Sequence, residues 1–178
     1  MAAISVKRVA RFLEYGRNGN NTTEQGKALE DLVCYLFGKI PGISVTHRNQ
    51  LNTFATEEID VALWNEKRRP GFHFLPHVLL IEAKNWSAPV GSAEVAWFDR
   101  KLRDRGLDLG ILVAIRGVTG NTADRTAAHQ IIAGSLRESR RILVMTGDDL
   151  GELRDTKDLV LLLKTRLCDL AVSGTVFP

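Results

Sequence analysis

Two short apolar stretches decide the fold class: residues 58–63 read EIDVAL and residues 79–85 read LLIEAKN. Both have the length and the β-prone composition of strands. Side chains alternate across a strand, so Glu82 and Lys84 share one face of the second stretch. If the two strands pair, and antiparallel pairing is the simplest connection, Asp60 and Glu82 converge near one face of a sheet.

The remaining pattern alternates between helical and strand periodicity. Its order is helix, three strands, helix, strand, helix, strand, helix. The last strand–helix–strand unit implies a right-handed crossover and a parallel pair of strands. We therefore expect an α/β fold with a mixed sheet flanked by helices. The expected helices cover residues 22–37, 92–105, 122–139 and 157–171, and the expected strands cover 43–48, 58–64, 77–83, 109–115 and 142–146.

Length and charge bound the class of protein. The chain has 178 residues, with 24 Lys and Arg against 21 Asp and Glu, and a formal net charge of +3. Such a chain suits one domain and is neither disordered, collagen-like nor a disulfide scaffold. A turn-rich stretch over 16–21 predicts a linker, so we expect an N-terminal helix and linker over 1–21, a core over 22–155, and a C-terminal helix and tail over 156–178.

The cysteines and the apolar runs bear on localisation. Cys34 and Cys168 lie far apart among apolar residues, which favours two buried, reduced thiols. No apolar run approaches the roughly 20 residues of a membrane-spanning helix, and the start lacks the features of a secretory signal. We expect a cytoplasmic protein with no membrane partner.

The chemistry-bearing residues lie at the adjoining ends of the two decisive strands. Charged groups in apolar strands cost free energy unless they pair or bind something. Two carboxylates close together, Asp60 and Glu82, suit Mg²⁺, and Lys84 beside them could favour a deprotonated water and offset phosphate charge. The alternative is a same-face ion pair between Glu82 and Lys84, with Asp60 a mere strand-end residue.

Three motifs in order resemble the PD-(D/E)XK nuclease superfamily, and most closely its Mrr-like (type IV) restriction endonuclease domains. The motifs read GKALEDLV over 26–33, EIDV over 58–61 and IEAKNW over 81–86, and the strand–helix–strand unit over 110–150 follows them. The resemblance spans roughly residues 22–155. It implies a restriction-endonuclease-like αβββαβ core, with a nuclease core over 22–155, and metal-dependent hydrolysis of phosphodiester bonds, in DNA rather than RNA, in a defence or repair setting.

The resemblance also implies roles for single residues. Asp60, Glu82 and the carbonyl of Ala83 would hold Mg²⁺, for which Mn²⁺ could substitute, and Lys84 would assist the attacking water. Glu30 would be an auxiliary acid at the edge of the buried stripe of the first helix, although a solvated carboxylate is an equal alternative. The Gln that this branch often carries in the following helix is absent from residues 92–97, in which Glu94 or Trp97 is nearest.

Basic residues suggest contacts with nucleic acid, and the short flanks of the core suggest a partner. Phosphate contacts supply sequence-independent affinity, but solvated helix and loop faces explain such charges equally well. Specificity would come from a homodimer, a separate target-recognition partner or the loops of the sheet. The candidate contact residues are Lys67, Arg68, Arg69, Arg100, Lys101 and Arg103.

Two other functions remain open at this point. One is a catalytically silent nucleic-acid-binding or assembly module on the same fold. The other is a small-molecule enzyme that uses a carboxylate–lysine pair, which the absence of a cofactor loop disfavours.

Overall fold

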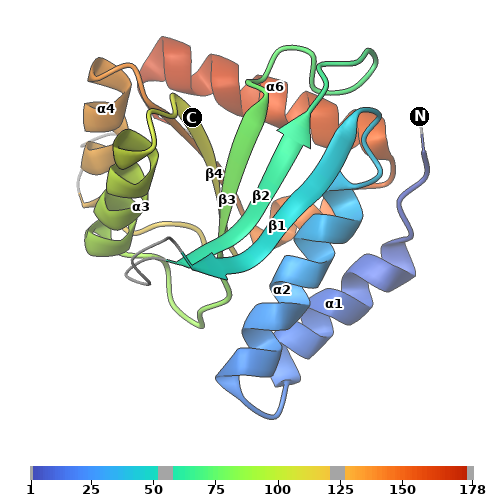
Figure 1. Cartoon of the computed structure of the whole chain (residues 1–178). Helices are drawn as coiled ribbons and strands as arrows, with labels where there is room; N and C mark the ends of the chain where they lie inside the picture. Colours follow the sequence, from blue (N-terminus) through green and yellow to red (C-terminus); the bar gives the residue numbers. More distant parts are fainter. Residues whose placement is uncertain (1, 52–57, 121–126, 176–178) are drawn as a thin grey trace.

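The structure, a computed structural model, describes residues 2–51, 58–120 and 127–175, and in these residues the strands form one five-stranded sheet with the order β1-β2-β3-β4-β5 (Figure 1). The first three strands form an antiparallel meander, and the last two run parallel to β3. The bounds are β1 Ile43–Leu51, β2 Glu58–Asn65, β3 Val78–Lys84, β4 Leu109–Ala114 and β5 Arg141–Met145. The expected mixed sheet, with its antiparallel pair and its parallel pair, is confirmed.

Each parallel step of the sheet is bridged by a helix, as parallel pairing requires. α3 (Ser92–Asp104) connects β3 to β4, and α4 (Ala128–Arg137) connects β4 to β5. The expected helix over 122–139 corresponds to α4, and the part of it over 122–126 lies outside the described residues.

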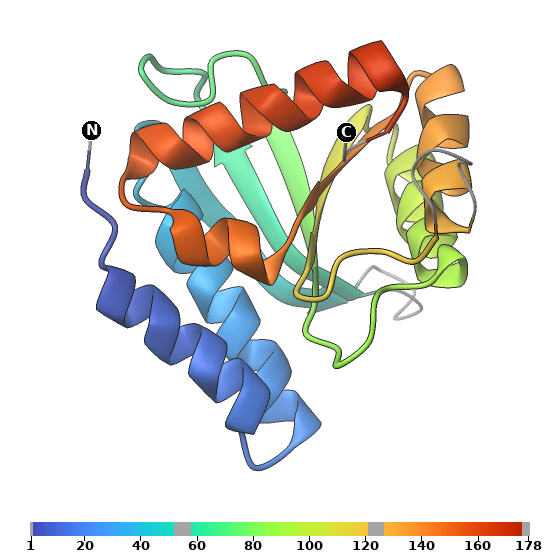
Figure 2. The same cartoon turned by 180° about the vertical axis from the view of Figure 1, so that it is seen from behind.

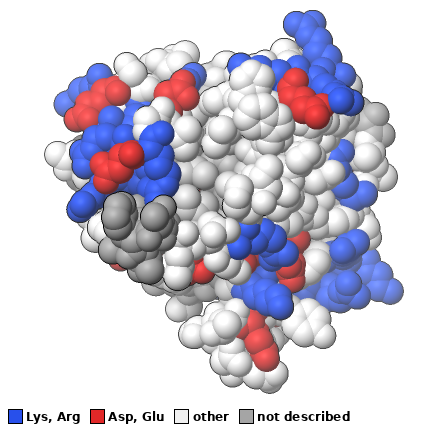
Figure 3. All heavy atoms as spheres, viewed as in Figure 1, with Lys and Arg blue, Asp and Glu red and all other residues white. Residues whose placement is uncertain are grey.

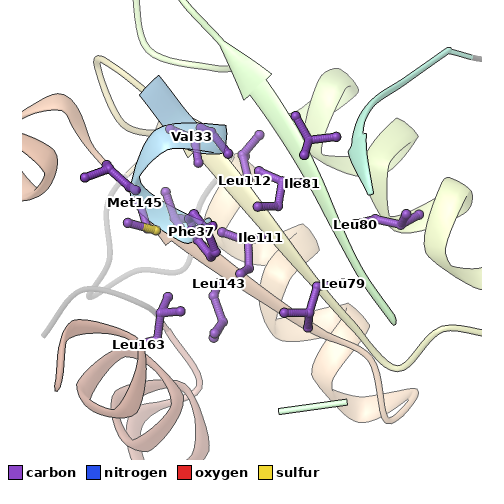
Figure 4. Packing of buried hydrophobic residues seen from close by; sticks show 14 of the residues in the cluster. Val33, Phe37, Leu79, Leu80, Ile81, Ile111, Leu112, Leu143, Met145 and Leu163 are labelled. Carbon is purple, nitrogen blue, oxygen red and sulfur yellow. The ribbon is translucent and has the colours of Figure 1, made fainter. Parts of the chain in front are cut away.

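The two faces of the sheet are covered by different helices. α2 (Thr22–Phe37) and α6 (Thr156–Ser173) cover one face, as the view from behind shows (Figure 2). Figure 4 shows Val33 and Phe37 of α2 and Leu163 of α6 gathered around Ile111 and Leu143 of the sheet. The burial of these apolar side chains is the main source of stability.

α3 covers the other face. Gly110 of β4 lies so close to this helix that a Cβ atom there would meet Phe98 at 2.6 Å and Leu102 at 2.8 Å. Gly110 pairs with Leu80, and Glu82 lies two residues further along β3 on the same face. The α3 face is therefore the face that carries Glu82.

The segments that flank the core pack on it. α1 (Val6–Asn18) contacts α2, α6 contacts β5, and Ala3 forms a β-bridge with Asp155. The division of the chain at residues 21 and 155 stays a prediction. No helix in the described residues is long and apolar enough to cross a membrane.

The structure differs from the sequence-based expectations in local details. β1 continues to Leu51, although every residue after Ile43 is exposed, because pairing with β2 continues. A short helix, α5 (Gly147–Glu152), was not predicted, yet Thr146 and Asp149 form a capping box at its start. Cys34 is half-buried and Cys168 is exposed, so the prediction of two buried thiols was wrong: Cys168 lies on the solvent side of α6.

Candidate active site

Asp60 and Glu82 lie at the end of the β2–β3 hairpin where the ladder stops. The paired positions end at Val61 and Ile81, and one further step sets Asp60 opposite Glu82, because the register is antiparallel. At that step a side-chain oxygen of Asp60 takes the place of a backbone carbonyl as hydrogen-bond acceptor: its Oδ2 accepts from the N–H of Ala83 at 2.7 Å. The hairpin thus brings the two predicted carboxylates onto one face of neighbouring strands.

Glu82 is buried between two ammonium groups. Glu82 is 4 % exposed. Nζ of Lys84 lies 2.8 Å from its Oε1, and Nζ of Lys101 lies 2.8 Å from its Oε2. Lys101, itself 5 % exposed, also donates to the carbonyl of Glu58 at 2.7 Å. Because charged hydrogen bonds are strong in a dry site, these contacts hold the Glu82 carboxylate in one orientation.

Burial and neighbouring charges shift the pKa values of Asp60 and Lys84. Burial, followed by repulsion from Glu82, raises the pKa of Asp60 from 3.8 to about 6, although the Ala83 N–H and the two lysines oppose the shift. Burial works to lower the pKa of Lys84, but the charge and hydrogen bond of Glu82 outweigh it and leave that pKa raised. The Ala83 N–H and the two lysines therefore offset only part of the cost of charging the buried Asp60 carboxylate.

This donor set fits a divalent cation of the Mg²⁺ type. Asp60 and Glu82 offer hard carboxylate oxygens, and Oδ1 of Asp60 accepts no hydrogen bond from the described residues. A cation here would also relieve the repulsion that raises the pKa of Asp60. Ala83 contacts Asp60 through its N–H, and a role of its carbonyl as a metal ligand stays a prediction.

Glu30 lies one strand away from the carboxylate pair. Its side chain is 14 % exposed, and its Oε2 accepts a hydrogen bond from Nδ2 of Asn49 at 2.9 Å. Asn49 lies between the β1 residues that pair with Val61 and Ile59, and so stands across from Asp60. With a φ of 47°, Asn49 adopts the left-handed conformation that Asn tolerates. Glu30 is thus connected to the strand beside the site, and its role as an auxiliary acid stays a prediction.

The predicted phosphate contacts lie in two places, the loop after β2 and helix α3. The basic loop over 67–69 follows β2, and so lies at the opposite end of the hairpin from Asp60, about 16 Å along the strand. Arg100 and Arg103 are exposed on α3, the helix that also carries Lys101, and both pair with Asp104. Among these candidates, only those on α3 therefore belong to an element that reaches the carboxylates, and it does so through Lys101.

The prediction of Lys101 as a surface contact was wrong. Its ammonium group is buried and bound to Glu82 and to the Glu58 carbonyl, which leaves no exposed charge for a phosphate on the surface. A signal in the sequence could have revealed this: Lys101 follows Phe98 by three residues and Val95 by six, so it lies on the edge of the apolar stripe of α3. A lysine at that position needs a buried partner.

Glu94, named above as one nearest equivalent of the absent Gln, also faces the site. Its charge contributes to the raised pKa of Lys84. Glu94 and Lys101 lie seven residues apart on α3, which places them on one side of the helix. This side of α3 forms the wall of the site opposite the β2–β3 hairpin.

One family model matches most of the chain. The model of a family described as restriction endonuclease, Mrr_cat, matches residues 22–153, and so includes α2, all the strands and the whole candidate site. A search of curated proteins finds no match to this chain. Given the extent of the family match and the mixed sheet that carries Asp60, Glu82 and Lys84, the chain belongs to the restriction endonuclease family, as an Mrr-like catalytic domain of the PD-(D/E)XK type.

Proposed function

We propose that this protein hydrolyses phosphodiester bonds in DNA with the help of Mg²⁺ or Mn²⁺. The observation that carries the proposal is the juxtaposition of Asp60 with a Glu82 carboxylate that two lysines hold in place, at the end of a hairpin in a chain of the restriction endonuclease family. A defence or repair setting, and specificity through a homodimer or a separate recognition partner, belong to the same proposal.

Asp60 and Glu82 would hold the metal ion, which supplies Lewis-acid polarisation of the phosphate and a more acidic bound water. Lys84, 2.8 Å from Glu82, can orient the attacking water and stabilise the negative charge that develops on the phosphate. Lys101 fixes the other oxygen of Glu82, so that the carboxylate is oriented before substrate binds. Glu30 would adjust the site through Asn49.

The decisive experiment is incubation of the protein with plasmid, linear DNA and RNA, with and without Mg²⁺ or Mn²⁺, beside Lys84→Ala. We expect cleavage of DNA with either metal, and a loss of about a hundredfold or more in turnover for Lys84→Ala, the scale of one lost electrostatic group. DNA affinity should stay nearly unchanged, because one cation contributes little to the total. A folded Lys84→Ala protein that cleaves at the wild-type rate would reduce the Glu82–Lys84 pair to a structural ion pair.

A second candidate is a catalytically silent nucleic-acid-binding module on the same fold. One observation favours it: each oxygen of Glu82 already bonds to an ammonium group, so the carboxylate is satisfied without a metal. Thermal unfolding separates the two functions. Binding of Mg²⁺ to the native state raises the melting temperature, and the silent module predicts no such rise and no cleavage.

A further inference from the structure

We propose that Trp86 and Trp97 stack unpaired bases of the substrate, so that the substrate is a single strand or a locally unpaired stretch of nucleic acid. The inference rests on the proposed nuclease function, because it takes the cleaved phosphate to lie at Lys84. Both tryptophans are 43 % exposed, so each presents a large aromatic surface on which a partner can stack.

Trp86 lies beside the reactive end of β3. It follows Lys84 by two residues, and Nζ of Lys84 lies 5.9 Å from the centre of its ring. The same ammonium group is bonded to Glu82. A base stacked on Trp86 would therefore belong to a nucleotide whose phosphate is within reach of the candidate catalytic group.

Trp97 lies on the side of α3 that faces the site. It precedes Lys101 by four residues, one turn of helix, and Lys101 reaches across to Glu82 and to the start of β2. The guanidinium of Arg100 lies 5.4 Å from the centre of the Trp97 ring. Each exposed ring thus has a cation beside it, and an aromatic surface with an adjacent cation suits a base followed by its phosphate.

Among the described residues, β1 forms an exposed edge of the sheet. Every β1 residue after Ile43 is exposed, and on β2 Ala62 is half-buried, so α3 does not cover this half of the sheet. Figure 3 shows Lys and Arg side chains, with Asp and Glu among them, at the left, where α3 and α4 lie, and at the lower right, where α1 and α2 lie, and a mostly uncharged area in the middle of this face. Cations at the margin suit a phosphate backbone, and an uncharged floor suits bases.

The bases must be unpaired, because a duplex keeps the faces of its bases stacked inside the helix. Only single-stranded, flipped or bulged bases can lie on an aromatic ring. Trp64 offers a matched comparison: it is 44 % exposed, but His77 stacks on it at 5.2 Å and it lies four residues along β2 from Asp60.

The test measures binding without chemistry. A fluorescein-labelled DNA strand of 30 nucleotides, and the duplex that contains it, are each titrated with wild-type protein in EDTA at low salt. Fluorescence anisotropy measures the binding. We expect tighter binding of the single strand, a loss of single-strand affinity of about 5-fold or more in both Trp86→Leu and Trp97→Leu, and duplex affinity within about twofold of wild type, as loss of one stacked base predicts. Trp64→Leu should behave as wild type, and the Phe variants at 86 and 97 should keep most of the affinity.

Leucine keeps the apolar bulk, and circular dichroism and melting temperatures check that each variant is folded. Equal binding of strand and duplex, or losses in the Trp86 and Trp97 variants no larger than in Trp64→Leu, would overturn the inference. This binding test measures no cleavage, so its failure is distinct from failure of the proposed function, which the cleavage assay above tests. If the protein binds a single strand through the tryptophans but cleaves nothing in that assay, only the nuclease function is refuted. If it cleaves duplex DNA independently of the tryptophans, only the stacking is refuted.

Discussion

Glu82 has two ammonium partners, whereas Asp60, on the neighbouring strand, accepts a backbone N–H and has no ion pair among the described residues. Burial and repulsion from Glu82 raise the pKa of Asp60, and no ion pair in the described part of the chain offsets them. A folded protein that holds an incompletely compensated carboxylate is less stable than it could be, as functional sites often are. Two residue changes test this reading.

The first prediction concerns Asp60→Asn, whose amide can still accept the Ala83 N–H. Because the pKa of Asp60 rises from 3.8 to about 6 on folding, its contribution to stability is full below pH 3.8 and is lost as pH rises through 6. In EDTA above pH 6, Asp60→Asn should therefore be more stable than wild type, by up to about 3 kcal/mol. Urea unfolding at pH 4 and pH 8 measures this, and a variant less stable than wild type at pH 8 would contradict it.

The second prediction concerns Lys101→Met, which keeps the length of the side chain and removes its charge. Breaking a buried ion pair costs about 3 kcal/mol, so the melting temperature should fall in EDTA. Since Glu82 then lacks one cation, Mg²⁺ should raise the melting temperature more than in wild type, while turnover falls because Glu82 is less well oriented. Arg103→Met, an exposed change on the same helix, is the control. A smaller Mg²⁺ effect than in wild type would refute this role of Lys101.

At the scale of elements, the position of α3 over the sheet decides whether the site is complete. Gly110 allows the close approach: its missing side chain leaves room for Phe98 and Leu102, and this packing presents Lys101 to Glu82. The contact also explains why a glycine stands inside a buried strand, where it otherwise weakens the structure. At its other edge α3 is held by the ion pair between Asp99 and Arg140, at 2.8 Å.

The third prediction follows from this packing. In Gly110→Ala the new Cβ would overlap Phe98 and Leu102, so α3 must shift, at a cost of about 1–3 kcal/mol. We expect a lower melting temperature together with lower turnover, because Lys101 moves away from Glu82. Gly134→Ala in α4, where a Cβ meets nothing within 4 Å, should instead stabilise the protein by up to about 1 kcal/mol. Equal melting temperatures for the two variants would disprove the steric argument.

At the scale of the whole molecule, the site is tied to the N-terminal helices. Asn85, the residue after Lys84, donates hydrogen bonds to the carbonyls of Gly16 at 2.8 Å and Gln25 at 2.7 Å. A Cβ at Gly16 would lie 2.7 Å from Nδ2 of Asn85, so the two residues are closely packed. The residue after β3 thus connects the C-terminal end of α1 to the N-terminal end of α2, although 60 residues of chain separate Asn85 from Gln25.

The fourth prediction concerns this connection. Asn85→Ala removes the side-chain donor from the carbonyls of Gly16 and Gln25, at a cost of about 1–3 kcal/mol. We expect a lower melting temperature and faster amide hydrogen exchange over residues 16–25, with slower exchange elsewhere preserved. Asn20→Ala, which removes an exposed contact with Glu24 in the same turn, should cost less than about 1 kcal/mol. Unchanged exchange over 16–25 in Asn85→Ala would mean that the connection carries no stability.

The sequence alone determined the strands, their faces and the carboxylate pair. Alternation within residues 79–85 predicted that Glu82 and Lys84 share a face, and this holds because a strand repeats every two residues whatever surrounds it. Asp60 was expected beside them if the two strands pair, and the antiparallel register of β2 and β3 sets it opposite Glu82. The order of helices and strands was equally local information, because it depends on periodicity and turn residues. The restriction-endonuclease-like fold follows from that order, and the family match agrees.

Only the tertiary structure decided which distant groups meet. Lys101 lies 19 residues from Glu82, and its place in the site depends on how α3 packs over Gly110, a long-range contact that no local pattern encodes. The same holds for the basic loop over 67–69, which the direction of the hairpin carries to the far end of β2, and for Asn85, which meets the α1–α2 turn. Periodicity determines which side of an element is buried, but the packing of elements against one another determines which partner each buried charge contacts.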